Sequence, residues 1–264
     1  MHFEIKEIVP DEVLVFRADY NTNSDADMAK GDEKDYSGGK ITFGSQGKEG
    51  EALISLIIGN SHYARYLPEK NIDENCGTLM AWLKPFWRTA NYIGVDQGRH
   101  LFSLYKNHND SNSGENKRLV RDVQPPDESV FSINLAVFKN KGTTAQIRYT
   151  DSAGAEYVNM LSVDTNKDEG QRWYKDGPDK WTHLALTWDS VKGMIKLYIN
   201  GELTGNKELD KWMPYLVGRE SWMKVGDASK GTFTEFWGLI DRFKVYGKPL
   251  KDKHVKEIYN QEKD

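Results

Sequence analysis

Residues 181–205 read WTHLALTWDSVKGMIKLYINGELTG, and apolar side chains occupy every second position on both sides of a short polar turn at 189–193. These apolar positions are Leu184, Leu186, Trp188, Ile195, Leu197 and Ile199. Period-two alternation on both sides of a glycine-containing turn is typical of a β-hairpin with one buried face. Asn200-Gly201 follows the second half, and because both residues tolerate positive φ, the pair predicts the next tight turn.

Three further segments show related patterns in chain order. They are VLVFRADYNTNSDADMAKGD at 13–32, GTLMAWLKP at 77–85, and GLIDRFKVY at 238–246 followed by Pro249-Leu250. Together with residues 181–205, these segments resemble the laminin-G-like domains of the concanavalin A-like superfamily, which includes pentraxins, legume lectins and glucanases. The resemblance extends from Val13 to Ile258, nearly the whole chain.

The resemblance implies an all-β fold, a two-sheet antiparallel β-sandwich of the concanavalin A-like jelly-roll type. Alternation and apolar runs predict further strands at 13–20, 40–44, 51–58, 77–86, 92–95, 100–106, 129–138, 143–150 and 155–162. Val255, Ile258 and Tyr259 share one face of residues 252–261, which predicts a short amphipathic C-terminal helix. Because neither an internal repeat nor a linker is visible, we expect one domain over residues 1–264.

Composition excludes some functions. The formal net charge is −4, and no cluster of Lys and Arg is long enough to attract a phosphate backbone, so we expect no nucleic-acid partner. No apolar run approaches the roughly 20 residues of a membrane helix, which predicts no membrane insertion. The single cysteine, Cys76, cannot form an internal disulfide and is interpreted as a small hydrophobic residue.

The N-terminal residues, MHFEIKEIVP, lack the basic-then-apolar order of a signal peptide. The resemblance nevertheless implies a domain that acts outside the cytoplasm, in an extracellular, periplasmic or cell-surface setting. We therefore expect a mature or excised domain to which Met1 was added, and other domains of a larger surface protein as possible partners.

Aromatic residues in polar loops are the candidate carbohydrate-binding residues. They are Trp173 and Tyr174 beside Arg172, and Trp212, Tyr215 and Trp222. Sugars bind to aromatic ring faces and a few planar polar groups, and the polar neighbours of these residues are poorly explained by core packing. The alternative is that these rings fold back over the edge of a sheet.

Asp241 is the candidate metal ligand. It lies among Leu239, Phe243 and Val245 in a period-two pattern, which predicts a buried carboxylate that is either hydrogen-bonded or coordinated. The resemblance implies a structural calcium ion held by Asp241 with Asn21 and Asp19, although the chain departs from the family pattern at Asp19-Tyr20-Asn21 and at Arg242. The alternative is a carboxylate that accepts backbone amides without a metal.

A second acidic set follows in the sequence DADMAKGD, where Asp25, Asp27 and Asp32 lie close together. The spacing lacks the pattern of an EF-hand loop. Asx-turns and a short helical turn from Asp27 through Gly31 account for these residues without a cation.

An enzyme of the same fold, a polysaccharide lyase or a glycoside hydrolase, is the alternative function. The E-x-D-x-x-E spacing of retaining glycosidases in this superfamily does not occur, and residues 146–148 carry Arg where lyase relatives carry His. The segment SHYARY brings together His62, Tyr63, Arg65 and Tyr66, groups suited to acid–base chemistry. Alternation along this segment splits the four residues between two faces, which favours a solvated edge strand.

These observations favour a non-catalytic carbohydrate-binding, lectin-like or adhesion module with no assigned catalytic residue. The expected partner is a polysaccharide or glycan, and the expected cofactor is a structural calcium ion. A spacer module within a larger surface protein is the third possibility, because the fold alone does not select a function.

Overall fold

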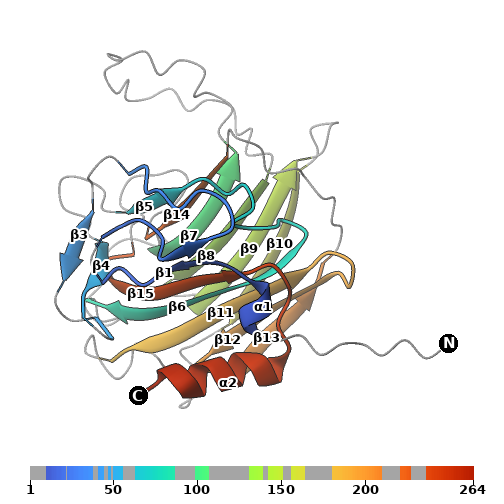
Figure 1. The fold of residues 1–264 in the computed structure, drawn as a ribbon. Helices are drawn as coiled ribbons and strands as arrows, with labels where there is room; N and C mark the ends of the chain where they lie inside the picture. The colour runs from blue at the N-terminus through green and yellow to red at the C-terminus, as the bar shows by residue number, and fades with distance from the viewer. Residues whose placement is uncertain are drawn as a thin grey trace, which may run out of the picture.

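The computed structural model describes residues 10–21, 23–37, 41–44, 47–48, 50–55, 63–86, 99–106, 131–138, 142–150, 156–163, 180–209, 221–226 and 236–264. Within these residues the chain forms two antiparallel sheets that face each other, a one-turn helix α1 (Pro10–Val13) and a C-terminal helix α2 (Asp252–Glu262) (Figure 1). Neither helix of this described part is long and apolar enough to cross a membrane.

The larger sheet has nine strands, and its main path runs in the order β13-β12-β11-β6-β15-β1-β2. The strands are β1 (Leu14–Ala18), β2 (Met28–Ala29), β3 (Thr42–Gly44), β4 (Ala52–Ser55), β6 (Cys76–Pro85), β11 (Thr182–Asp189), β12 (Met194–Ile199), β13 (Glu202–Glu208) and β15 (Gly238–Tyr246). β4 pairs with both β15 and β3, outside the main path. β6 lies at the centre and pairs with β11 on one side and β15 on the other.

The smaller sheet has six strands in the order β10-β9-β8-β7-β14-β5. They are β5 (Ala64–Tyr66), β7 (Arg99–Lys106), β8 (Phe131–Phe138), β9 (Gly142–Thr150), β10 (Glu156–Val163) and β14 (Ser221–Val225). β5 and β10 are therefore its two edge strands. The all-β sandwich with a short C-terminal helix is confirmed, whereas the single domain over residues 1–264 stays a prediction.

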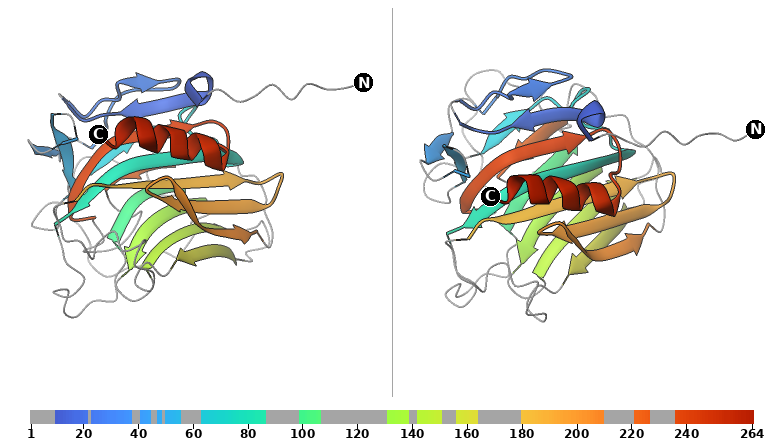
Figure 2. Two further views of the ribbon diagram at one scale, coloured as in Figure 1. Left: turned by 90° about the horizontal axis from the view of Figure 1, so that it is seen from below. Right: turned by 60° about the horizontal axis from the view of Figure 1, so that its bottom comes forward.

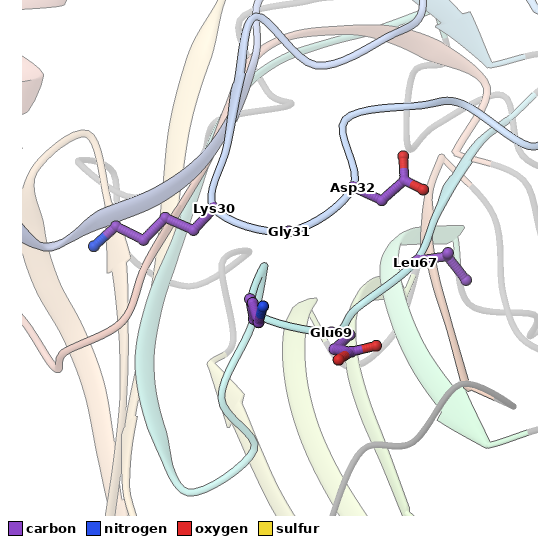
Figure 3. A pocket seen from close by; sticks show the side chains of 6 residues that line it. Lys30, Gly31, Asp32, Leu67 and Glu69 are labelled. Carbon is purple, nitrogen blue, oxygen red and sulfur yellow. The ribbon is translucent and has the colours of Figure 1, made fainter.

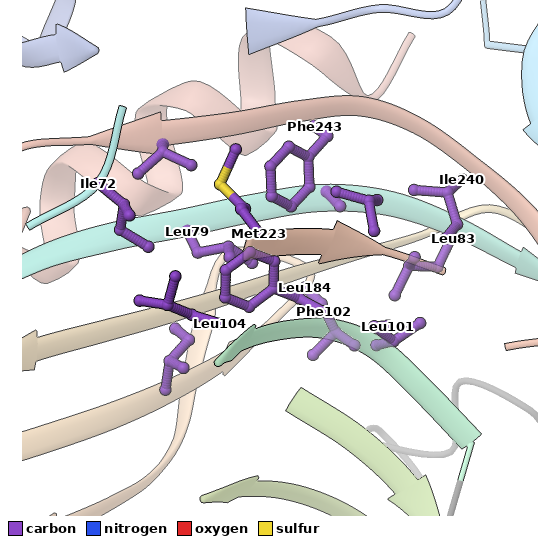
Figure 4. Packing of buried hydrophobic residues seen from close by; sticks show 14 of the residues in the cluster. Ile72, Leu79, Leu83, Leu101, Phe102, Leu104, Leu184, Met223, Ile240 and Phe243 are labelled. Atoms are coloured by element: carbon purple, nitrogen blue, oxygen red, sulfur yellow. The ribbon is translucent and has the colours of Figure 1, made fainter. Parts of the chain in front are cut away.

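The core lies between the two sheets (Figure 4). Its members include Leu79, Leu83, Leu184, Ile240 and Phe243 from the larger sheet and Leu101, Phe102, Leu104 and Met223 from the smaller one. Phe102 and Phe243 stack across the interface, with ring centroids 5.6 Å apart and an interplanar angle of 25°. Each fully buried side chain of this size contributes about 1.5–3 kcal/mol through loss of apolar surface from water.

The hairpin expected from residues 181–205 is confirmed, with β11 and β12 in antiparallel register. All six alternating apolar residues belong to the core between the sheets. Asn200 and Gly201 have φ values of 51° and 76°, which confirms the tight turn after β12. The expectation of one buried face is wrong, because Ala185 and Tyr198 on the opposite face are also buried.

α2 covers that second face of the larger sheet, lying across β15, β6 and β11 (Figure 2). Its Val255 and Ile258 pack against Met80, Ala185 and Tyr198 in a second apolar cluster. The inward orientation of Val255 and Ile258 was predicted from the helical spacing, and the structure confirms it.

Three strands, β2, β13 and β14, were not predicted from the sequence. Neither β13 nor β14 has a counterpart among the predicted strands. Met28–Ala29 forms β2 against β1, so the predicted helical turn from Asp27 to Gly31 is wrong. The expected strand at 92–95 lies outside the described residues.

β15 contains a bulge that changes which face its side chains occupy. The pairing with β6 shifts register between Asp241 and Lys244, and Arg242 has a φ of 48°. As a consequence Phe243 enters the core between the sheets while Asp241 pairs opposite Trp82 on the side of α2. The sequence-based placement of Asp241 on one face with Phe243 and Val245 is therefore wrong.

The imidazole of His183 lies on this outer face beneath α2. Its ring centroid is 5.2 Å from that of Trp82 and 5.9 Å from that of Tyr259. Within the described part of the chain neither ring nitrogen has a hydrogen-bond partner, and the residue is 1% exposed. Burial therefore lowers the pKa of His183 to about 4, although the charge of Glu262 opposes this shift.

His183 predicts a loss of stability in acid. The unfolded chain takes up a proton near the ordinary histidine pKa of 6.5, whereas the folded chain keeps this imidazole neutral down to about 4. The free energy of unfolding should therefore fall by up to about 3 kcal/mol between these pH values. We expect His183→Leu to flatten that decline, as measured by urea unfolding at pH 7 and pH 5.

Asp241, whose raised pKa acts with the opposite sign over the same pH range, is present in both proteins of this comparison. The difference between wild type and His183→Leu in how the free energy of unfolding changes with pH therefore reports the contribution of the imidazole alone. Equal pH slopes for the two proteins would contradict the assignment.

Candidate functional site

The predicted carbohydrate-binding residues are only partly covered by the structure. Arg172, Trp173, Tyr174, Trp212 and Tyr215 lie outside the described residues, so their roles stay predictions. Trp222 is described, and it lies on β14 beside the edge strand β5.

The position of Trp222 follows from strand alternation. Met223 and Val225 of β14 enter the core, so Trp222 and Lys224 point to the opposite face of the six-stranded sheet. Lys224 pairs with Arg65 of β5, which lies on that face as well. This outer face therefore carries charged and aromatic side chains from two neighbouring strands.

Six residues form what we call the Trp222 cluster. They are Lys34, Tyr36, Tyr63, Arg65, Trp222 and Lys224. The Arg65 guanidinium carbon lies 4.3 Å from the centroid of the Trp222 ring, and the Tyr36 ring is tilted at 5.7 Å from it. Two lysine ammonium groups also lie over rings, Lys224 at 4.4 Å from Tyr63 and Lys34 at 5.6 Å from Tyr36.

Residues 32–37 run along β5 and hold Tyr36 in the cluster. The Tyr36 amide donates to the carbonyl of Arg65 at 2.7 Å, and the Arg65 amide donates to Asp35 Oδ1 at 2.9 Å. Arg65 Nε and Nη2 both donate to the Tyr36 carbonyl, at 3.1 and 2.6 Å. The backbone and the guanidinium of Arg65 are therefore fixed by the same short segment.

Asp32 orients the Tyr36 ring. Its Oδ2 accepts the Tyr36 hydroxyl at 2.9 Å, and its Oδ1 accepts the Lys34 amide at 2.8 Å. The Lys34 amide and the Tyr36 hydroxyl lower the pKa of Asp32, so this carboxylate is ionised at neutral pH. Such Asx-type bonds were expected for this acidic segment and are confirmed here.

Asp32, which accepts the Tyr36 hydroxyl of the cluster, also lines a pocket of about 470 Å³ (Figure 3). Its lining residues are Lys30, Gly31, Asp32, Leu67, Glu69 and Lys70. The buried Asn71 joins the two walls, because its Oδ1 accepts the Gly31 amide while its Nδ2 donates to the carbonyls of Asp32 and Leu67. A Cβ on Gly31 would lie 1.9 Å from the Glu69 carbonyl oxygen, which excludes any larger residue there.

The segment considered for catalysis is divided as its alternation predicted. Ala64 and Tyr66 are buried, Arg65 points to the opposite face, and β5 is an edge strand. The Tyr66 hydroxyl donates to the Ser24 carbonyl at 2.7 Å, and burial raises the pKa of Tyr66 well above its ordinary value, so the phenol is not available as a base. His62 lies outside the described residues.

Sequence reasoning missed Lys34 and Tyr36 as site residues. They follow the acidic segment in a run without periodicity, and the pattern DEKDYS contains no motif for ligand binding. A prediction that residues 28–29 pair with β1 could have found them, because the chain that leaves β2 runs to β5 at the edge of the smaller sheet.

Asp241 is 1% exposed, as predicted, and both carboxylate oxygens accept backbone amides. Oδ2 accepts the Lys48 amide at 2.6 Å and Oδ1 accepts the Arg242 amide at 2.7 Å. Burial raises the pKa of Asp241 to about 6, while these two amides and the Arg242 charge act in the opposite direction. This is the amide-capping arrangement that the sequence left as the alternative to coordination.

The other two predicted metal ligands are arranged differently. Asn21 is exposed, and its Oδ1 lies close to Gly50, 2.9 Å from where a Cβ on that residue would be. Asp19 lies 3.2 Å from Arg17 Nε, and burial raises the pKa of Asp19. The described chain contains no group of three or more His, Cys, Asp or Glu side chains arranged to hold a metal ion. Calcium takes roughly 6–8 oxygen ligands, and a structural calcium ion held by Asp241, Asn21 and Asp19 stays a prediction.

A family profile described as "Concanavalin A-like lectin/glucanases superfamily", of laminin-G type, matches residues 120–256. The chain belongs to this superfamily. It is 23% identical to C-reactive protein of Cavia porcellus over 183 residues, which are 63% of this chain and 78% of that protein.

Solved structures share the fold at low identity. The botulinum neurotoxin serotype D ligand-binding domain in complex with N-acetylneuraminic acid has a TM-score of 0.63 at 12% identity over 95% of this chain. Domain 4 of an extracellular arabinanase from Geobacillus stearothermophilus, in complex with arabinotriose, has a TM-score of 0.52 at 16% identity over 93% of this chain and 98% of its own. The chain spans about half the length of the toxin binding domains that it matches.

The geometry of Asp241 predicts that calcium leaves the protein's thermal stability unchanged. A cation at this carboxylate would share each oxygen with an amide donor, and an ion that binds at about 100 times its dissociation constant would add about 2.7 kcal/mol of stability. We expect equal midpoints of thermal unfolding in calcium and in EDTA, measured by calorimetry. A rise in calcium that Asp241→Asn abolishes would contradict this expectation.

Proposed function

We propose that this protein binds carbohydrate without cleaving it and that the Trp222 cluster is a binding surface. The observation that carries the proposal is the convergence of Trp222, Tyr36 and Arg65 on the outer face of β14 and β5. The rings are only partly buried there, unlike the aromatic residues of the core. Carbohydrate recognition uses such ring faces together with a few planar polar groups.

The cluster is preorganised for binding. Arg65 is held through its backbone amide, its carbonyl and its guanidinium, and Tyr36 is held through its hydroxyl and its amide. A ligand therefore orders few side chains when it binds, which reduces the entropic cost of association. The pocket lined by Asp32, which holds the Tyr36 hydroxyl, extends the surface beyond a single ring.

The superfamily and two structural neighbours support a binding role. The neurotoxin domain is described with N-acetylneuraminic acid, and the arabinanase domain with arabinotriose. These ligands belong to those proteins, and identities of 12% and 16% carry the fold alone to this chain. An extracytoplasmic location is part of the same proposal, whereas calcium at Asp241 is not required by it.

The alternative enzyme function has less support among the described residues. A glycoside hydrolase needs two carboxylates on either side of the scissile bond. The carboxylates next to the Trp222 cluster, Asp32 and Asp35, instead accept hydrogen bonds from residues 34–37 and from the Arg65 amide.

Replacement of Trp222 tests the proposal. We expect Trp222→Ala to weaken binding about tenfold or more, because a central aromatic side chain commonly carries over 1.4 kcal/mol of binding energy. Retardation in native gels cast with a panel of neutral and acidic polysaccharides would measure the affinity, and the same gels stained for depolymerisation would detect cleavage.

Trp181→Ala is the matched control, because Trp181 is also partly buried and lies outside the cluster. Circular dichroism would verify that both variants fold. Unchanged retardation of Trp222→Ala would place binding elsewhere, and cleared zones around the wild-type band would contradict a non-catalytic role.

A further inference from the structure

We infer that the Trp222 cluster selects acidic glycans, with Arg65 receiving the carboxylate or sulfate of a sugar whose ring lies against Trp222 and Tyr36. This inference rests on the proposed function and adds the chemical class of the ligand. It follows from how the cluster distributes its hydrogen-bond donors and charges.

Arg65 has donors left for a ligand. Its guanidinium carries five N–H groups, of which one on Nε and one on Nη2 donate to the Tyr36 carbonyl. Three remain, two on Nη1 and one on Nη2, and they form the edge that matches the two oxygens of a carboxylate. Within the described chain no carboxylate lies within ion-pair distance of this guanidinium.

The carboxylates near Arg65 accept donors of residues 32–37 and the backbone amide of Arg65. Asp35 Oδ1 accepts the amides of Arg65 and Ser37, and Oδ2 accepts the Ser37 hydroxyl. Asp32 accepts the Lys34 amide and the Tyr36 hydroxyl. Their oxygens therefore accept backbone and hydroxyl donors and leave the guanidinium edge of Arg65 without an anionic partner from residues 32–37.

Three cations lie over aromatic rings on the same surface. They are Arg65 over Trp222, Lys224 over Tyr63 and Lys34 over Tyr36. A ring face beneath a cation places a flat apolar surface directly beside a charged donor. A sugar with an acidic substituent offers both matching groups, an apolar ring face and an anion, whereas a neutral sugar offers the ring face with uncharged hydroxyl groups.

The charge of the whole chain makes this surface distinctive. The net charge is −4, so the protein as a whole repels polyanions. Attraction of an acidic polymer must therefore come from a local arrangement of donors. The loss of binding on replacing one such residue can be measured because non-specific attraction of polyanions by the rest of the chain is weak.

The test compares polygalacturonate with its methyl ester, which keeps the sugar and removes the charge of the carboxylate. We expect the wild-type protein to bind the free acid about tenfold or more tightly than the ester, the gain typical of charge-assisted hydrogen bonds. Dextran sulfate and unmodified dextran distinguish sulfate from carboxylate as the anion. Titration calorimetry gives the dissociation constants.

Three variants identify the residue. Arg65→Gln should remove the preference for the free acid, and Arg65→Lys should restore it in part, because the charge returns without the planar pair of donors. Lys192→Gln, on the exposed turn between β11 and β12, removes one positive charge outside the cluster and should leave the preference unchanged.

The possible results separate this inference from the proposed function. Equal affinity for acid and ester, with both lost in Trp222→Ala, would overturn the inference and leave carbohydrate binding in place. Absence of binding to any glycan would overturn both. A preference for the free acid that survives Arg65→Gln would also overturn the inference, and the acid-to-ester ratio of the wild type remains decisive if that variant fails to fold.

Discussion

The central strands of the larger sheet carry apolar side chains on both faces, and each face has to be covered. Leu79 and Leu184 face the smaller sheet, while Met80 and Ala185, the next residues in the chain, face α2. Burial on both sides makes the register of β6, β11 and β15 unambiguous, because a shift of one residue would exchange the two sets. The smaller sheet covers one of these faces and α2 covers the other.

The pattern in residues 181–205 predicted the hairpin because period two is a local property, and the same holds for the spacing in α2. The prediction that Asp241 shares a face with Phe243 was wrong because Arg242 adopts a φ of 48°, and the bulge there interrupts the alternation of side chains along β15. β14 was missed because this five-residue strand is stabilised by its pairing with β7 and β5, which are distant in sequence.

The candidate site could be predicted from the sequence only in part. Trp222 was found because an aromatic residue among polar neighbours is conspicuous, and Arg65 and Tyr63 because they lie in a cluster of polar and aromatic groups. Their meeting with Tyr36 depends on residues 32–37, which the two-residue strand β2 turns toward the edge of the other sheet. No single segment contains the site, so no motif within one segment identifies it.

The contacts of residues 32–37 with β5 have a consequence for the protein in solution. β5 ends the smaller sheet, and an edge strand with unpaired amides and carbonyls is a template for pairing with another chain. The Arg65 amide donates to Asp35 Oδ1, and the Arg65 carbonyl accepts the Tyr36 amide. At this residue neither backbone group is therefore free to pair with a strand of another chain. The segment that shapes the binding surface thus also protects this edge against aggregation.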